Sequence, residues 1–492
     1  MRQRLFVWLT ADHSLVSEIL RSVEALSLSQ TRVDKVIVSG VISPHDQETI
    51  AYFISEKNFS FHFSPNIGIN DLEAERLILV RSGSLVESGI SRLASIMDTF
   101  PASSFFYADS ADHNGNVFLR PAPSPIRLQA QDYLGPCIGL NLSELRQNEW
   151  FIECDFGLNP YQLALRLFHE EGCDPFVLVP HVVVSESLES NPDLQLSRSI
   201  AREELSQCGV KASLDLVSGK KSWRVRYELA EEPLVSIVIP TRGSAAMIAG
   251  KDRILIVEAL RGVIDRTTYR NYEIVVVYDE STPRDVLMQL EQLCEGKLVL
   301  VPWNHAFNFS AKMNLGVLHA KGDFVLLLND DIDLITPDWL ETLLGLAMQP
   351  RVGMVGAMLY FEDQTYQHVG QIYVDGAAGH AAFGYRGGSD DNLGTLSVDR
   401  EVSGVTAACA LVRKDIYLAV GGMSLSFPNN YNDVDLNLKI RHLGYSSVVS
   451  PWVKLYHFES KTRDPTVTTN ELDLLRGRWS SWIQSEMYSR GL

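Results

Sequence analysis

Short apolar runs alternate with amphipathic segments along the chain, and they occur in the same order twice. Near the N-terminus, RLFVWLT predicts a buried strand, SEILRSVEALSLS has the spacing of a helix, and DKVIVSG predicts a second strand. From residue 234 the same order returns as LVSIVIPTRG, ILIVEALRGVIDRT and YEIVVVYDEST. Strand, helix and strand at this spacing form a βαβ unit, so each copy predicts parallel strands in an α/β sheet.

The two copies also match further along the chain. Residues 159–172 (NPYQLALRLFHEEG) align without gaps on residues 432–445 (NDVDLNLKIRHLGY), and an apolar run follows each segment. The stretch between the copies is helical and then polar, as expected of a linker. We therefore predict the α/β class with two tandem Rossmann-like domains, at residues 1–195 and 233–492, joined by a linker at 196–232.

The most unusual junction in this pattern is the stretch FVLLLNDDID at residues 324–333. Its apolar half predicts a buried strand, and this strand runs directly into Asn329, Asp330, Asp331 and Asp333. Adjacent carboxylates at a strand end are suited to a hard divalent cation such as Mg²⁺ or Mn²⁺. The alternative is a solvated loop. Asp333 is left without a role at this point.

Two further strand ends of the second copy carry polar residues. The turn Pro240–Thr241–Arg242 follows one predicted strand, and Asp279 follows the next. In α/β sheets, ligands bind beyond the C-terminal ends of the parallel strands, so both positions are candidate ligand contacts. An ordinary turn and a helix-capping Asp are the alternatives.

Two candidates lie closer to the C-terminus. Asp433 falls in the first turn of an amphipathic helix, where a carboxylate either favours the helix dipole or takes a proton from an attacking hydroxyl. His457 follows a strand-like run and precedes Lys461 and Arg463, in a polar segment that could close over a site. A structural histidine is the alternative.

Composition narrows the function classes. With 46% hydrophobic and 21% charged residues, the chain is typical of a soluble globular protein, and 492 residues are too many for one ordinary core. The net charge of −18 argues against nucleic acid as a main partner, because phosphate backbones are bound by basic faces.

Cysteine use and hydropathy indicate a compartment. The six cysteines are scattered without a CxxC pair, which favours reduced thiols in a cytoplasmic protein over a disulfide frame or a zinc site. No apolar run approaches the roughly 18 residues that cross a bilayer. The N-terminal run is expected to begin a strand and not a signal peptide. Peripheral attachment at the inner face of a membrane is left open.

Taken together and in order, the motifs resemble glycosyltransferase family 2, the nucleotide-sugar-dependent inverting enzymes of GT-A fold. The resemblance spans roughly residues 234 to 465 and rests on SIVIPTRG, YEIVVVYDEST, FNFSAKMNLG, KGDFVLLLNDDID, GVTAACALVRKDIYLAVGGM, YNDVDLNLKIRHLGY and LYHFES. The two-copy layout is similar to large bacterial enzymes of O-antigen, rhamnan and other surface-polysaccharide synthesis.

The resemblance implies a role for each candidate. Asp279 and the turn Pro240–Thr241–Arg242 would hold the nucleobase and ribose of the donor. Asn329–Asp330–Asp331 would be the DXD-like element, with Asp331 a ligand of Mn²⁺ or Mg²⁺ and Asp330 near the ribose or metal. His457 would be a second metal ligand, and Asp433 would be the catalytic base. Asn329 and Asn432 stand where many members of the family carry acidic residues.

The first copy lacks these groups. The counterpart of the acidic cluster is Arg81–Ser82–Gly83–Ser84, Pro160 stands at the position of Asp433, and Ser185 and its neighbours replace His457. The first GT-A-like domain is therefore predicted to be degenerate and catalytically inert, serving as a packing partner, acceptor platform or scaffold.

These observations predict an inverting, metal-dependent glycosyltransferase. The donor is expected to be a UDP- or dTDP-linked sugar, and the acceptor a hydroxyl of a growing glycan or lipid-linked glycan of the cell surface. One alternative is a non-catalytic nucleotide-sugar-binding or scaffold protein of a polysaccharide assembly complex. Another is a sugar-phosphate nucleotidyltransferase, for which IPTRGSAAM is a poor nucleotide loop. Donor sugar and acceptor stay open.

Overall fold

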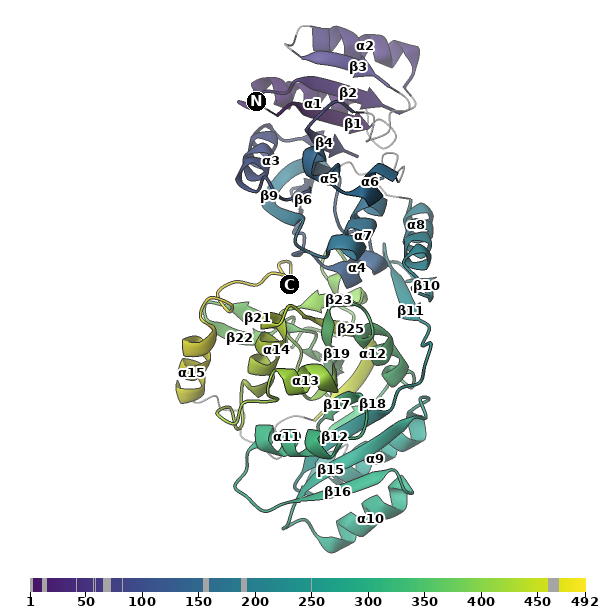
Figure 1. Cartoon of the computed structure of the whole chain (residues 1–492), viewed down its shortest axis with the longest axis vertical. Helices are drawn as coiled ribbons and strands as arrows, with labels where there is room; N and C mark the ends of the chain where they lie inside the picture. Colours follow the sequence, from purple (N-terminus) through teal and green to yellow (C-terminus); the bar gives the residue numbers. More distant parts are fainter. Residues whose placement is uncertain are drawn as a thin grey trace. The chain divides into compact units, whose positions relative to one another are not determined.

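The structure, a computed structural model of the whole chain, divides into two compact units (Figure 1). Unit 1 comprises Met1–Val210 and Leu216–Trp223, and unit 2 comprises Lys211–Asp215 and Arg224–Arg490. The residues that the structure describes are 3–10, 16–40, 42–55, 57, 59–64, 72–81, 83–153, 159–186, 193–248, 250–458 and 469–492. We keep 1–195 and 233–492 as the proposed functional domains.

A mixed sheet forms the centre of unit 2. Its strand order is β16 (Leu298–Trp303), β15 (Tyr272–Asp279), β12 (Val235–Thr241), β17 (Phe324–Leu328), β24 (Cys409–Arg413), β19 (Val352–Tyr360), β25 (Ser446–His457) and β18 (Ile332–Leu334). The first four strands are parallel, and β24 is antiparallel to both of its neighbours. The C-terminal ends of β12, β15 and β17 therefore lie at one edge of the sheet.

Unit 1 repeats this sheet strand for strand. Its order is β3 (Ser60–Phe63), β2 (Lys35–Ser39), β1 (Leu5–Thr10), β4 (Arg76–Val80), β8 (Cys137–Asn141), β6 (Phe105–Asp112), β9 (Phe176–Glu186) and β5 (Ser84–Leu85). The sequence of parallel and antiparallel pairs is also the same. The prediction of two tandem α/β domains is confirmed.

Both faces of the unit 2 sheet are buried, which explains the continuous apolar runs of its strands. One face packs on α11 (Phe309–His319), α13 (Lys414–Ala419) and α14 (Asn432–His442). Gly316 makes a close approach possible, because a Cβ at this position would lie 2.3 Å from Cγ1 of Val238 on β12. One helical turn before Gly316, Lys312 lies on the same side of α11 and reaches the C-terminal ends of the strands.

Some elements were not predicted. A short hairpin, β13 (Ala245–Ile248) with β14 (Lys251–Ile254), separates β12 from the helix α9 (Leu255–Arg266). The segment predicted as a linker contains α8 (Leu194–Gln207) and a hairpin of β10 (Ala212–Leu216) and β11 (Trp223–Tyr227). Turn-forming residues near Gly243 and Gly219 interrupt the apolar pattern, so the sequence did not predict these short strands.

Two further observations concern the helices and the cysteines. Of the helices in the described ranges, none combines the length and apolar character that a membrane crossing requires. The five described cysteines, Cys137, Cys173, Cys208, Cys294 and Cys409, are free thiols.

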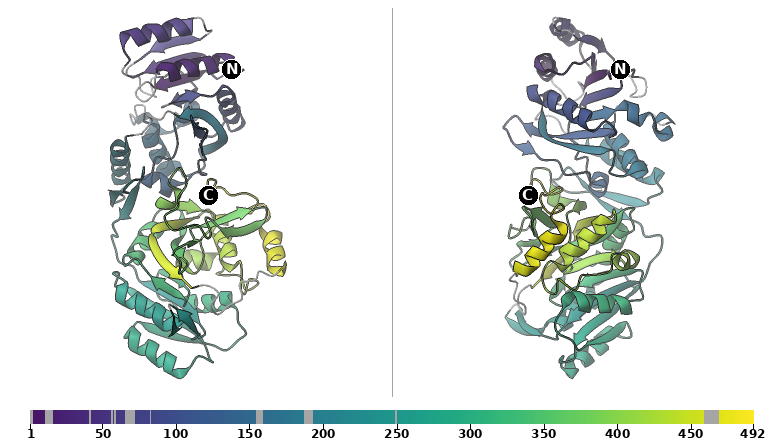
Figure 2. Two further views of the ribbon diagram at one scale, coloured as in Figure 1. Left: turned by 180° about the vertical axis from the view of Figure 1, so that it is seen from behind. Right: turned by 60° about the vertical axis from the view of Figure 1, so that its left-hand side comes forward.

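A buried carboxylate joins α14 to α15 (Thr469–Trp479), which lie side by side in the right-hand view of Figure 2. Asp435 of α14 has 0% of its side chain exposed and accepts hydrogen bonds from Arg478 Nη1 at 2.7 Å and Trp479 Nε1 at 2.9 Å. Lys439 adds an ion pair at 3.5 Å. This carboxylate thus fixes the helix whose first turn carries Asp433.

We expect Asp435→Ala to destabilise unit 2 by about 3 kcal/mol, because it leaves buried donors and cations without their acceptor. Asp415→Ala is the matched control, since its pair with Arg413 is exposed and is expected to contribute less than about 1 kcal/mol. Thermal unfolding of the full chain measures both. Equal melting temperatures for the two variants would contradict the anchoring role of Asp435.

Candidate active site

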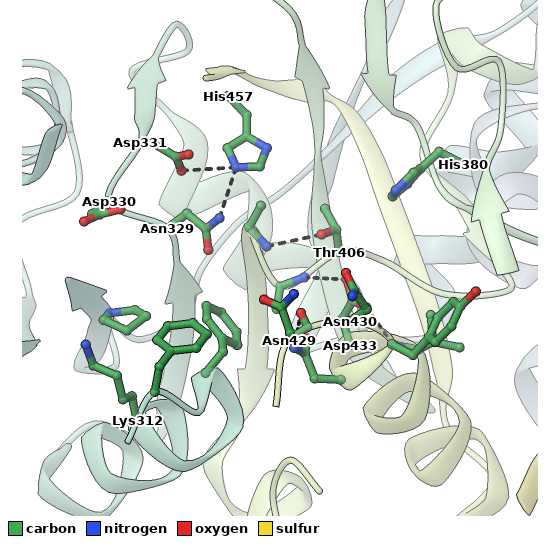
Figure 3. A pocket seen from close by; sticks show the side chains of 18 of the residues that line it. Lys312, Asn329, Asp330, Asp331, His380, Thr406, Asn429, Asn430, Asp433 and His457 are labelled. Carbon is green, nitrogen blue, oxygen red and sulfur yellow. Dashed lines mark hydrogen bonds and ion pairs between the residues drawn. The ribbon is translucent and has the colours of Figure 1, made fainter. Parts of the chain in front are cut away.

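A polar cavity of about 320 Å³ opens at the C-terminal ends of the unit 2 strands. Its wall includes the ends of β12 and β17, the loop 406–408, the first turn of α14 and residues 378–380 of a hairpin (Figure 3). Seven of the eight predicted site residues line this cavity: Pro240, Thr241, Arg242, Asp330, Asp331, Asp433 and His457. Asp279 does not belong to the wall.

Asp331 and His457 come together because β18, directly after the acidic cluster, pairs with β25. His457 Nε2 lies 3.1 Å from Asp331 Oδ1 and 3.0 Å from Asn329 Nδ2. Burial acts to raise the pKa of Asp331, but the neighbouring His457 charge and hydrogen bond outweigh it, so this pKa is lowered. Asp331 is therefore held as an anion.

Gln367 fixes the tautomer of His457. The Gln367 Nε2 amide donates to the His457 carbonyl at 3.4 Å, so its Oε1 must accept, at 2.7 Å, from His457 Nδ1. A neutral His457 then has its lone pair on Nε2, which faces Asp331 Oδ1. This carboxylate oxygen is buried and lacks a hydrogen-bond partner. Two acceptor atoms this close require a proton or a cation between them: either His457 is protonated on Nε2, the state in which its charge and hydrogen bond lower the pKa of Asp331, or a cation lies between Nε2 and Oδ1.

The donor set fits a divalent cation. Neighbouring ligands of an octahedral ion with bonds of about 2.1 Å are about 3.0 Å apart, which matches the Asp331–His457 spacing. Within the described part of the chain, no cluster of three or more His, Cys, Asp or Glu side chains forms a complete metal cage. A partial ligand set of this kind is usual where phosphate oxygens of a substrate complete the coordination of Mg²⁺ or Mn²⁺.

Asp330 and Lys312 connect the cluster to the neighbouring strands. Asp330 Oδ2 accepts a hydrogen bond of 2.5 Å from Thr241 Oγ1, and burial together with the charge of Asp331 raises the pKa of Asp330. Lys312 Nζ donates to the Thr241 carbonyl and to Asp279 Oδ1, both at 2.8 Å. Burial lowers the pKa of Lys312, and Asp279 offsets part of this effect. Asp279 thus contacts the site through Lys312.

Arg242 lies over an aromatic ring at the rim. Its guanidinium carbon is 5.8 Å from the centre of the Phe307 ring, and both residues line the cavity. Phe307 is 46% exposed, which leaves a face of the ring open to a planar ligand.

Asp433 lies across the cavity from Asp331 (Figure 3). Its Oδ1 accepts from the backbone N–H of Val434 at 2.8 Å, and its Oδ2 accepts from the N–H of Ala407 at 3.3 Å. Asn437, one turn later, exchanges hydrogen bonds with both backbone groups of Val405. The loop 405–408 and the start of α14 therefore form one rigid wall.

Two acidic residues that follow Asp331 in the sequence form structural ion pairs. Asp333, which had no role in the sequence, forms an ion pair of 2.7 Å with Arg266 and is 41% exposed. Asp338, at the start of α12 (Trp339–Ala347), is bound by Arg224 and Arg226, each at 2.9 Å. Lys461 and Arg463, predicted to close over the site, lie outside the described residues.

Sequence reasoning missed two participants. Lys312 lies within the motif FNFSAKMNLG, which carried the family resemblance without a role for its lysine. Gln367 lies on the short strand β20 (Tyr366–His368), which pairs with β19 and brings Gln367 to His457. No local pattern indicates this pairing.

The equivalent edge of the unit 1 sheet carries different side chains. After β4, Arg81 occupies the position of Asn329, and its Nη1 binds Asp132 at 2.8 Å. Ser185 pairs across from Ser84, as His457 pairs across from Ile332. Pro160 begins the helix α7 (Pro160–Glu171). Ser82 lies outside the described residues. In the described part of this edge, an arginine side chain supplies the positive charge.

The chain is similar to several known proteins. Residues 236–421 match the family model described as Glycosyl transferase family 2, which confirms the resemblance that the motifs indicated. The chain is 35% identical over 272 residues to Uncharacterized protein y4gI of Sinorhizobium fredii (strain NBRC 101917 / NGR234), covering 53% of this chain and 29% of that protein. It is 28% identical over 372 residues to O-antigen biosynthesis protein RfbC of Myxococcus xanthus, covering 72% of this chain and 28% of RfbC.

The chain thus spans less than a third of the length of both curated relatives. A crystal structure of GalNAc-T7 with UDP, GalNAc and Mn²⁺ overlaps 53% of this chain and 50% of that chain, with a TM-score of 0.42 and 14% identity.

We expect Mn²⁺ together with UDP or dTDP to raise the melting temperature of the full chain, because a ligand at about 100 times its Kd stabilises by about 2.7 kcal/mol. Asp331→Ala and His457→Ala should each remove the part of the shift that depends on Mn²⁺. Asp333→Ala, two residues along the same stretch, should retain it. A Mn²⁺-dependent shift that survives in both site variants would contradict the metal assignment.

Proposed function

We propose that this chain, whose residues 236–421 form a glycosyl transferase family 2 domain, transfers a sugar from a nucleoside-diphosphate donor to an acceptor hydroxyl. The observation that carries the proposal is a single cavity with two opposed ends. One end holds the buried anion Asp331 facing the Nε2 lone pair of His457, and the other holds the carboxylate of Asp433.

Asp331 and His457 would hold the divalent cation, with Asn329 beside them. When bound, this ion neutralises the charge that develops on the leaving diphosphate. Thr241 positions Asp330 by its hydrogen bond, and Lys312 ties the ends of β12 and β15 together below the donor. Arg242 and Phe307 would hold the planar base at the rim. Uridine and thymidine are both compatible with this surface.

Asp433 is placed to act on the acceptor. Its two backbone hydrogen bonds fix the carboxylate, and it can accept the proton of a sugar hydroxyl as that oxygen attacks the anomeric carbon. Because Asp433 lies across the cavity from the diphosphate end, the attack would come from the face opposite the leaving group. One displacement of this kind inverts the anomeric configuration.

The acceptor is proposed to be a growing glycan of the cell surface, such as an O-antigen or capsule. This proposal rests on the similarity to a protein described by its O-antigen biosynthesis role and on the two-copy layout. A cytoplasmic site of action, at or near the inner face of the membrane, is consistent with a nucleotide-sugar donor. The non-catalytic alternative is disfavoured by the paired Asp331 and His457, which a decayed site would not need.

We expect Asp433→Asn to lower transfer by about 10²–10⁴-fold, because the amide cannot accept the hydroxyl proton. Donor binding in the presence of Mn²⁺, measured by thermal shift, should stay unchanged. Asp415→Asn controls for the loss of an exposed carboxylate. Near-normal turnover by Asp433→Asn would remove this residue from the role of base.

Domain one is proposed to be inert. In the full chain, Asp331→Ala should therefore abolish all transfer and all donor hydrolysis, since no second site is available to replace the first. Product formation from radiolabelled UDP- and dTDP-sugars measures this. Residual activity that is lost on replacing Arg81 in unit 1 would show that the first copy is catalytic.

A further inference from the structure

Two histidines are in contact at the cavity that Asp433 lines, and one of them, His380, belongs to its wall. His380 ends the hairpin of β21 (Gln371–Val374) and β22 (Ala377–His380), lines the cavity and points into it (Figure 3). His368 lies behind it with 1% of its surface exposed. The two Nδ1 atoms are 2.8 Å apart. None of the roles assigned above uses these rings.

The hydrogen bonds determine where each proton lies. The backbone N–H of Thr406 can only donate, and it donates to His368 Nε2 at 3.2 Å. A neutral His368 therefore has its proton on Nδ1, from which it donates to His380 Nδ1. Burial, reinforced by His380, lowers the pKa of His368 well below its usual value and keeps the ring neutral. The proton of a neutral His380 consequently lies on Nε2.

This arrangement makes His380 a hydrogen-bond donor and excludes it as a base. Protonating His380 at Nδ1 would break its bond to His368, and Nε2 has no lone pair to accept a proton. The consecutive N–H groups of Thr406 and Ala407 bind His368 and Asp433, respectively. One short loop thus fixes the donor and the carboxylate in a common frame.

An exposed aromatic ring continues this wall outside the cavity. The Phe383 ring is nearly parallel to the His380 ring, with centres 6.1 Å apart and an interplanar angle of 26°, and it is 54% exposed. Phe361 supports it edge to face at 5.3 Å.

The turn that carries Phe383 is firmly held. Ala381 donates to the Gly370 carbonyl at 2.9 Å, Gly384 donates to the Tyr366 carbonyl at 2.8 Å, and Tyr366 donates to the Tyr385 carbonyl at 2.8 Å. The backbone therefore presents the ring to solvent, although a Phe of this exposure is unfavourable in water. A sugar ring has an apolar C–H face that packs on the electron-rich face of an aromatic ring.

We propose that His380 donates a hydrogen bond to a hydroxyl oxygen of the acceptor sugar, and that Phe383 is a stacking face for the next sugar residue of that acceptor. This inference rests on the proposed function and names the acceptor half of the same site. The acceptor class is a glycan at least two residues long, because the wall extends from the cavity to a second ring.

The test measures transfer by the full chain from a panel of UDP- and dTDP-sugars. The acceptor probes are p-nitrophenyl glucoside, galactoside and N-acetylglucosaminide, and their two-sugar counterparts p-nitrophenyl maltoside, lactoside and chitobioside. His380→Phe should raise the acceptor KM of both probe classes about tenfold, which corresponds to one lost hydrogen bond of about 1.4 kcal/mol. His380→Gln keeps an amide N–H donor and should stay within about threefold of the wild type. The donor KM should not change in either variant.

Phe383→Ala should raise the acceptor KM for the two-sugar probes only, by about five- to tenfold, in line with about 1 kcal/mol for a stacked ring. Leu443→Ala removes another exposed apolar side chain of unit 2, 49% exposed, and should change neither class.

Each outcome decides between the two proposals. A wild-type chain that transfers to no probe and hydrolyses no donor contradicts the proposed function and the inference with it. A wild type that hydrolyses donors in a Mn²⁺-dependent manner but transfers to no probe overturns the inference alone. Three further results would also overturn the inference alone. They are an unchanged acceptor KM in His380→Phe, an equal effect of Phe383→Ala on both probe classes, and a raised donor KM in either variant.

Discussion

The constraint on which the candidate active site depends is the repulsion of two adjacent carboxylates at the end of a buried strand. Asp330 and Asp331 follow β17, whose five residues are all buried, and burial adds to the repulsion between the two carboxylates. The fold offsets this repulsion in a different way for each carboxylate. Asp330 is bound by Thr241 and lies near the buried charge of Lys312, so it is held by the protein alone. Asp331 meets His457 with an unpartnered oxygen, so its balance depends on an added positive charge. The rest of the cavity surrounds this carboxylate, whose negative charge still needs a positive partner.

The two copies of the sheet show which features belong to the scaffold and which belong to the chemistry. Strand order and the alternation of parallel and antiparallel pairs are common to both, because these follow from buried apolar strands that connect by βαβ units. The polar residues at the strand ends are not common. Thr10 ends β1 and Thr241 ends β12, yet the Thr10 hydroxyl donates to the Arg81 carbonyl, whereas the Thr241 hydroxyl donates to a carboxylate. The same sheet therefore tolerates carboxylates at this edge in one copy and an arginine at the equivalent edge in the other.

Much of this organisation could be predicted from the sequence, because it depends on patterns that are local. Continuous apolar runs predicted β12, β15 and β17, and the acidic residues that follow β17 lie in the wall of the cavity, where a cation is proposed to bind. What could not be predicted depends on pairings between distant segments. The isolation of Asp279 behind Lys312 requires the close packing of α11 on β12 at Gly316, and the tautomer of His457 requires Gln367, 90 residues away. The tautomer of a neutral His380 likewise follows from Thr406, which contacts His368 only in the folded chain. Side-chain identity is visible in a sequence, but protonation is set by partners that folding brings together.

The Arg81–Asp132 pair has a consequence for the lifetime of the protein. The edge of unit 1 is completed by a positive charge that is covalently part of the chain, so its stability does not vary with metal or nucleotide concentration. If unit 2 binds a cation and a nucleotide-sugar donor as proposed, its edge is completed by that ligand, and its unfolding equilibrium shifts as the ligand becomes scarce. When donor sugar runs low, proteases that act on transiently unfolded chains would meet unit 2 before unit 1. The abundance of the protein in the cell would then follow the supply of its substrate, without any dedicated regulatory site.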